Sequence, residues 1–119
     1  MAVSPVKVIA EAMLEKKAKG VISLDLRKID QSIADHFLIC NADSTTAVAA
    51  IADNVIDKMR QECKRKVVRM QGLENAMWVI LDFGEIVVHI FLTQYREFYR
   101  LEDLWADARK RKFEDTPTN

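Results

Sequence analysis

Hydrophobic residues recur along the chain with two periods, which separate predicted helices from predicted strands. Near the N-terminus, apolar residues follow the three-and-four spacing of a helix that Ser4 can cap and Pro5 can open. Strict alternation over 21–27 (VISLDLR) predicts a strand. The continuous apolar run over 36–40 (HFLIC) predicts a central strand that is covered on both faces.

The rest of the pattern predicts a long helix, a short strand, a hairpin and a final helix, over about 44–63, 66–70, 76–92 and 94–112. The order of elements is therefore α-β-β-α-β-β-β-α. We expect a single α/β (α+β) domain, with a mixed five-stranded sheet flanked by helices. This domain should span residues 1–112, and residues 113–119 should form a frayed tail.

The hairpin is the most informative stretch. A two-residue turn at Phe83-Gly84 would use the positive φ that Gly84 adopts readily, and it would place Trp78 opposite His89. Alternation then sorts the side chains onto two faces. One face is entirely apolar and should be core: Met77, Val79, Leu81, Ile86, Val88 and Ile90. The other face is mixed: Trp78, Ile80, Asp82, Glu85, Val87 and His89.

The mixed face permits two interpretations. An amphipathic aromatic beside an imidazole, with aliphatics and carboxylates around them, is typical of a protein-binding patch. Alternatively, the C-terminal helix covers this face and Trp78 belongs to the core. The hairpin alone does not decide between them.

Composition limits the classes of function. Lysine and arginine together balance aspartate and glutamate, so the chain lacks the basic excess of proteins that bind nucleic acid by bulk electrostatics. Two local basic runs remain, 64–66 and 109–112; the second could touch RNA or simply be a solvated helix end. Nothing resembles a signal peptide or a membrane span, so we expect a cytoplasmic protein with no membrane partner.

Candidate chemistry is sparse. His36 and His89 are the only histidines, and no cluster around them has metal-ligand spacing. Cys40 and Cys63 fit no metal or redox motif and should be reduced thiols. With three glycines in the chain, no glycine-rich loop could cradle a phosphate. We therefore predict no catalytic residue, no metal and no cofactor.

Four strings resemble the Iojap/RsfS family of ribosomal silencing factors, in family order and at family spacing. They are 33–40 (IADHFLIC), 50–53 (AIAD), 78–91 (WVILDFGEIVVHIF) and 96–105 (REFYRLEDLW). The similarity covers about residues 5–108.

The resemblance implies a non-enzymatic protein that binds the large ribosomal subunit through ribosomal protein fourteen. Occupying that surface would block association with the small subunit and repress translation. It also implies a fold related to nucleotidyltransferases but without their catalysis. Carried over by position, the partner-binding residues are Trp78, Asp82, Arg96 and Tyr99, and His89 joins them from the mixed face of the hairpin.

The sequence departs from the family where Ala42 replaces the usual glycine and Ala47 replaces the usual glutamine or histidine. The alternative function is a degenerate nucleotidyltransferase-like enzyme. It would need carboxylates converging beside Ser44, for which Asp35, Asp43 and Asp82 are the candidates. Whether the free protein forms a homodimer through its tryptophan patch stays open.

Overall fold

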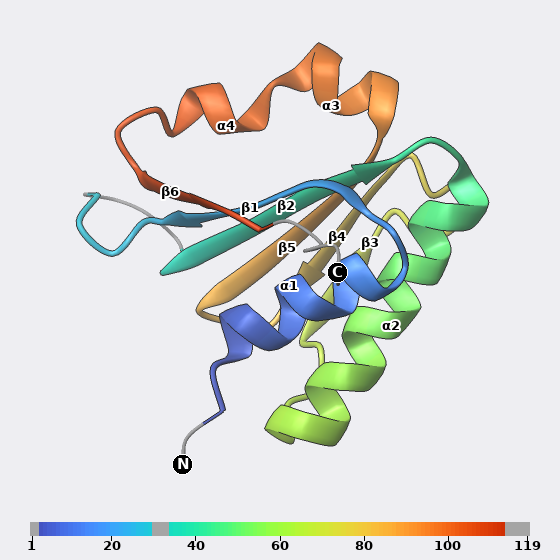
Figure 1. Ribbon diagram of the computed structural model, residues 1–119, viewed down its shortest axis with the longest axis horizontal. Coiled ribbons are helices and arrows are strands. Elements are labelled where there is room, and N and C mark those ends of the chain that lie inside the picture. Colours follow the sequence, from blue (N-terminus) through green and yellow to red (C-terminus); the bar gives the residue numbers. More distant parts are fainter. Residues whose placement is uncertain (1–2, 30–33, 114–119) are drawn as a thin grey trace, which may run out of the picture.

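A mixed six-stranded sheet forms the centre of the computed structural model, which describes residues 3–29 and 34–113 (Figure 1). The strand order is β3-β4-β5-β2-β1-β6. The β2–β5 pair is parallel and the other pairs are antiparallel. The strands are β1 (Lys19–Asp25), β2 (His36–Ala42), β3 (Arg69–Gln71), β4 (Trp78–Asp82), β5 (Ile86–Leu92) and β6 (Arg109–Lys112).

Two helices, α1 (Pro5–Glu15) and α2 (Thr45–Cys63), cover one face of the sheet (Figure 1). Each begins as the sequence predicts, because the Ser4 hydroxyl accepts from the Lys7 N–H and the Ser44 hydroxyl accepts from the Ala47 N–H. Their apolar stripes and the facing strand residues form the larger core. The predicted core residues Ile51, Val79, Leu81 and Val88 are fully buried there.

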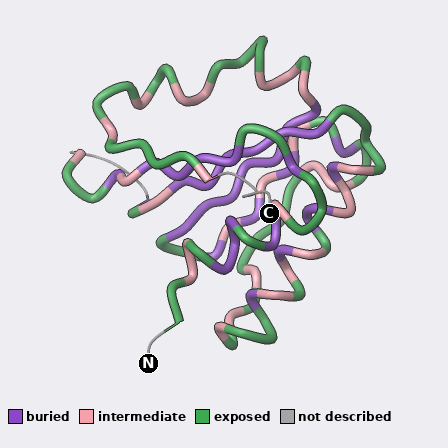
Figure 2. Tube along the Cα trace, in the orientation of Figure 1, coloured by how far each residue is buried: buried purple, intermediate pink, exposed green. Residues whose placement is uncertain are grey.

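The opposite face carries a smaller apolar cluster around Phe37, Ile39, Val87 and Phe91. Two short helices, α3 (Thr93–Tyr99) and α4 (Leu101–Leu104), cross this face and partly cover the cluster (Figure 1). Neither helix contains a buried residue, as Figure 2 shows. The C-terminal segment is therefore a thin cover whose outer surface is open.

The hairpin forms, but its predicted turn is wrong by one residue. Phe83 N–H donates to the Ile86 carbonyl at 2.9 Å, so the turn residues are Gly84 and Glu85. Glycine at the first turn position avoids the poor fit of Phe83 there. The register consequently moves by two: Trp78 pairs with Phe91, and Ile80 pairs with His89. An even shift preserves the faces, so the predicted core face is confirmed except at Met77, which is 37% exposed.

The predicted final helix over 94–112 is wrong. It breaks at Arg100, which adopts a left-handed φ of 49°, and it ends at Leu104. Residues 109–112 instead form β6, which pairs antiparallel with β1 and adds a sixth strand to the five that were predicted. Backbone hydrogen bonds to the free edge of β1 stabilise this strand, although four consecutive cationic residues have a weak intrinsic preference for strand.

The predicted tail begins at Phe113, which the structure describes, whereas 114–119 lie outside the described residues. Phe113 N–H donates to the Val21 carbonyl at 2.8 Å, and the ring packs against the larger core. No helix within the described residues is long and apolar enough to cross a membrane.

Candidate functional site

Trp78 lies at the start of β4 on the face that α3 crosses, and it is half-buried. Its ring stacks on Phe91, with centroids 4.8 Å apart, and packs at 5.0 Å against Tyr99. Its indole N–H donates to Nδ1 of His89 at 3.1 Å. Trp78 therefore joins the sheet to α3. It is neither a fully exposed residue of a binding patch nor a fully buried core residue, the two alternatives that the sequence left open.

His89 is buried in β5 beneath this cluster. Because the indole N–H can only donate, Nδ1 of His89 must accept, and neutral His89 therefore carries its proton on Nε2. Nε2 is buried and has no hydrogen-bond partner among the described residues. Burial lowers the pKa of His89 to about 4, so the imidazole is neutral near pH 7.

A small hollow of about 200 Å³ adjoins His89 on the part of the sheet that α3 and α4 leave open. Its floor is apolar, formed by Phe37, Ile80 and Val87. Its rim carries the polar residues Arg69, Gln71 and Asp82. The Asp82 carboxylate also accepts the Gly84 N–H at 2.7 Å, which ties the rim to the hairpin turn. The hollow thus combines an apolar base with polar groups at its margin.

The outer surface of α3 and α4 exposes large apolar side chains. Phe98 is 77% exposed, Tyr99 is 47% exposed and Leu104 is 74% exposed. Tyr99 packs inward on Trp78 and edge-to-face on Phe98, with centroids 5.0 Å apart in both contacts. We call Trp78, Phe98 and Tyr99 the aromatic ridge. It is anchored to the sheet yet open to solvent, as a protein-binding surface must be.

Arg96 faces into the molecule rather than toward solvent. Its guanidinium donates to the Gly20 carbonyl at 2.6 Å and to the Asn41 side chain at 2.8 Å. The same group pairs with Glu102 at 2.7 Å, and the Arg96 side chain is only 14% exposed. Asn41 in turn donates to Thr93 at the start of α3. This network fastens α3 and α4 to β1 and β2.

The five site residues predicted from the sequence fall into three groups. Trp78, His89 and Tyr99 are in direct contact or one ring apart. Asp82 lies at the other end of β4, where it shares the hollow with His89. Arg96 belongs to the internal network. Sequence reasoning missed Phe37 and Phe98. The exposed position of Phe98 beside Tyr99 could have been predicted only by ending the final helix at Arg100.

The family model described as "Ribosomal silencing factor during starvation" matches residues 2–119 of this chain. The chain belongs to this family. The ribosomal silencing factor RsfS of Bacillus subtilis is 40% identical over 105 residues, covering 88% of this chain and 87% of that protein. A crystal structure of a protein from Chromobacterium violaceum aligns with a TM-score of 0.81 at 30% identity, covering 99% of this chain and 92% of that one.

More distant relatives come from organelles. The chloroplastic protein Iojap of Zea mays is 35% identical over 100 residues, which cover 84% of this chain and 42% of that protein. The mouse protein named "mitochondrial assembly of ribosomal large subunit protein 1" is 33% identical over 84 residues, covering 68% of this chain and 35% of its own length. The family domain therefore occurs within longer proteins as well.

The carboxylates that the enzyme alternative needs do not converge. Asp35 and Asp43 flank the two ends of β2, roughly 25 Å apart at the rise of a strand. Asp82 pairs with Val87, whose neighbour in β2 is Phe37, so it lies toward the Asp35 end. Within residues 3–29 and 34–113, no group of three or more His, Cys, Asp or Glu side chains could hold a metal ion.

The family departure at Ala42 leaves an ordered loop. Ala42 is buried as the last residue of β2, and Asp43 accepts the Thr93 hydroxyl at 2.6 Å. Asp43 also pairs with Lys19, and these two contacts lower the pKa of its carboxyl. The loop is thus used to hold the start of α3, and its acidic residue already has partners.

Proposed function

We propose that this protein is a non-enzymatic silencing factor that binds the large ribosomal subunit through ribosomal protein fourteen and thereby blocks association with the small subunit. The observation that carries the proposal is the solvent-open aromatic ridge, anchored on a rigid sheet, in a chain that belongs to the ribosomal silencing factor family. Translation would be repressed because large and small subunits that are kept apart cannot form a complete ribosome.

The chemistry of the ridge and hollow suits a protein partner. Affinity in protein interfaces concentrates in a few desolvated aromatic anchors surrounded by a polar rim. Tyr99 and Phe98 supply such anchors, and Asp82 with Arg69 supplies a rim. Arg96 acts as a positioning residue, because its partners hold α3 in place.

The proposed block is steric competition. A small protein prevents subunit joining only if it occupies a surface that the joined ribosome needs. By linkage, the inhibition then equals the difference between its affinities for the free subunit and for the joined ribosome. The factor should therefore co-sediment with free large subunits and be absent from intact ribosomes.

Two minor features accompany this proposal. A free ridge of this kind can pair with its own copy about a two-fold axis, which would make the unbound protein a homodimer. A basic segment near the C-terminus can touch ribosomal RNA beside the protein contact. Both are secondary to binding ribosomal protein fourteen.

The test is binding of purified protein to large subunits and to isolated ribosomal protein fourteen. Tyr99→Ala should weaken both interactions at least tenfold, because truncating an anchor typically costs about 2 kcal/mol. Val68→Ala is the matched control, since Val68 is 73% exposed on the approach to β3, and it should change little. Wild-type protein that binds neither partner, or that binds intact ribosomes equally well, would overturn the proposal.

A further inference from the structure

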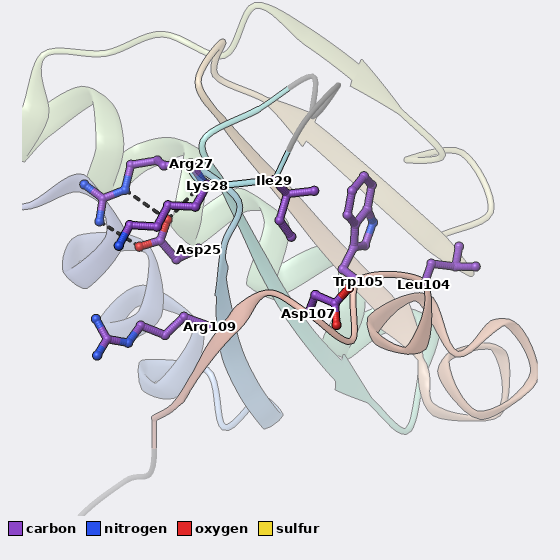
Figure 3. Close-up of a pocket in the computed structure, with 8 residues that line it drawn as sticks. All are labelled: Asp25, Arg27, Lys28, Ile29, Leu104, Trp105, Asp107 and Arg109. Carbon is purple, nitrogen blue, oxygen red and sulfur yellow. Dashed lines mark hydrogen bonds and ion pairs between the residues drawn. The ribbon is translucent and has the colours of Figure 1, made fainter.

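A cleft of about 650 Å³ lies between the end of β1 and the connection from α4 to β6. Figure 3 shows its two unlike walls. Arg27, Lys28 and Arg109 gather with Asp25 at one side, and Trp105 stands with Ile29, Leu104 and Asp107 at the other. This cleft is lined by none of the residues that line the hollow beside His89.

The cationic wall continues along β6. This strand closes one side of the sheet, so its outer backbone edge has no neighbouring strand in the described fold. All four of its side chains, Arg109, Lys110, Arg111 and Lys112, are exposed. Because side chains alternate along a strand, cations project from both faces of the edge. The result is a continuous basic strip in a chain whose formal net charge is zero.

Few of these cations have partners. Arg27 makes a two-pronged pair with Asp25, which holds the pKa of that carboxyl well below its usual range. Within the described residues, Lys28, Arg109, Lys110 and Lys112 form no ion pair. Arg111 lies over the Phe113 ring, 4.6 Å from its centroid. Charge that the protein does not neutralise internally is available to an anionic partner.

We propose that this cleft and the β6 strip bind a single-stranded segment of RNA, with phosphates on the cations and a base against Trp105. An aromatic ring with one open face beside a cationic groove is the arrangement by which proteins hold single strands without reading their sequence. Trp105 is half-buried, and its edge-to-face contact with Phe37 at 5.8 Å fixes the ring from behind. An acidic peptide would use the cations but would have no need of the apolar wall.

The inference deepens the proposed function, because the RNA on a large subunit would be ribosomal RNA next to the bound factor. The two claims still rest on different residues. Variants in the ridge should change binding to ribosomal protein fourteen, whereas variants in the cleft should change binding to RNA. Failure of one binding assay therefore leaves the other assay able to succeed.

The test titrates protein into a fluorescein-labelled single-stranded octauridylate and follows anisotropy at several salt concentrations. For wild type, affinity should fall steeply as salt rises. Arg109→Gln/Lys110→Gln should flatten the slope of log affinity against log salt by about 1.4, the amount expected for two lost phosphate contacts on a single strand. Lys16→Gln/Lys66→Gln removes the same charge from exposed positions elsewhere and should leave the slope unchanged.

Trp105→Leu separates stacking from charge. It should weaken octauridylate binding about tenfold without altering the salt slope, since a lost stack releases no counterions. Circular dichroism and thermal melts establish that each variant is folded, and every variant should still bind isolated ribosomal protein fourteen. The proposal is overturned if wild type does not bind the octauridylate, if the control pair matches the Arg109/Lys110 pair, or if a poly-glutamate peptide competes as well as RNA does.

Discussion

At the scale of single residues, His89 illustrates how one hydrogen bond determines a chemical state. The indole of Trp78 fixes its tautomer, and burial keeps it neutral. Both facts depend on how β4 and β5 pair and on what packs over them, which is not encoded next to His89 in the sequence. The sequence predicted that His89 lies on the Trp78 face, but the tautomer and the orphaned Nε2 depend on a register that the turn residues shifted by two.

His89 should make stability depend on pH. Its pKa is about 4 in the folded protein, against an ordinary 6.5, so the unfolded chain takes up a proton first as the pH falls. The contribution of His89 to the free energy of unfolding is therefore fully present above about pH 6.5. It is lost progressively as the pH falls to about 4, by roughly 3 kcal/mol. Urea unfolding across this window should show the loss in wild type and not in His89→Phe. Parallel curves for the two proteins would contradict the burial of a neutral imidazole.

The Trp78–His89 hydrogen bond should be measurable by a double-mutant cycle. Trp78→Phe keeps a ring on Phe91 and Tyr99 but leaves Nδ1 of His89 without its donor, at a cost of about 1–3 kcal/mol. In a His89→Phe background the same change should cost clearly less. Equal costs in both backgrounds would mean that stacking, and not the hydrogen bond, explains the role of Trp78.

At the scale of elements, the sequence predicted most of the helices and strands because their patterns are local. Ser4 and Ser44 cap the two long helices through contacts within four residues. The final segment was mispredicted because its conformation is set by remote contacts. Apolar spacing around Leu101 and Trp105 fits a helix, but the edge of β1 captures residues 109–112, and the chain must turn at Arg100 to reach it.

Arg96 should be the main fastener of α3 and α4. Arg96→Met would leave Glu102 and the Gly20 carbonyl without their donor, which should cost about 3 kcal/mol of stability. Amide exchange over 93–104 should accelerate more than exchange in β5. Arg100→Met is the control, because the ion pair of Arg100 with Asp103 is largely exposed and should be worth under about 0.5 kcal/mol. Similar effects of the two variants would disprove the assignment.

At the scale of the whole molecule, the sheet separates a face that is packed into the larger core from a face that carries the candidate binding surfaces. The side under α1 and α2 contains the larger apolar core and was predicted correctly from alternation. The other side has a small cluster under a thin cover, and its exposed aromatics and cations come from the segment that was mispredicted. Candidate function therefore lies where local patterns are weakest as predictors.

Removing β6 should uncover the edge of β1. A chain ending at Ala108 loses the β1–β6 pairing and the packing of Phe113, so its melting temperature should fall by several degrees. It should also self-associate at high concentration, because an open strand edge is a template for pairing. A chain ending at Phe113 keeps both features and should behave as wild type in melting and light-scattering measurements. Equal behaviour of the two truncations would show that β6 contributes nothing to the sheet.

The pairing of β6 with β1 also has a consequence for biosynthesis. β6 is translated long after β1, so Ser23 lacks its partner Arg111 while the intervening residues are being made. Contacts between such distant positions form late in folding, after a large loop-closure entropy has been overcome. Until β6 has been made, the nascent chain therefore lacks both the finished sheet edge and the basic strip. A factor that acts on ribosomes would thus gain its complete binding surface only after β6 has been translated and paired with β1.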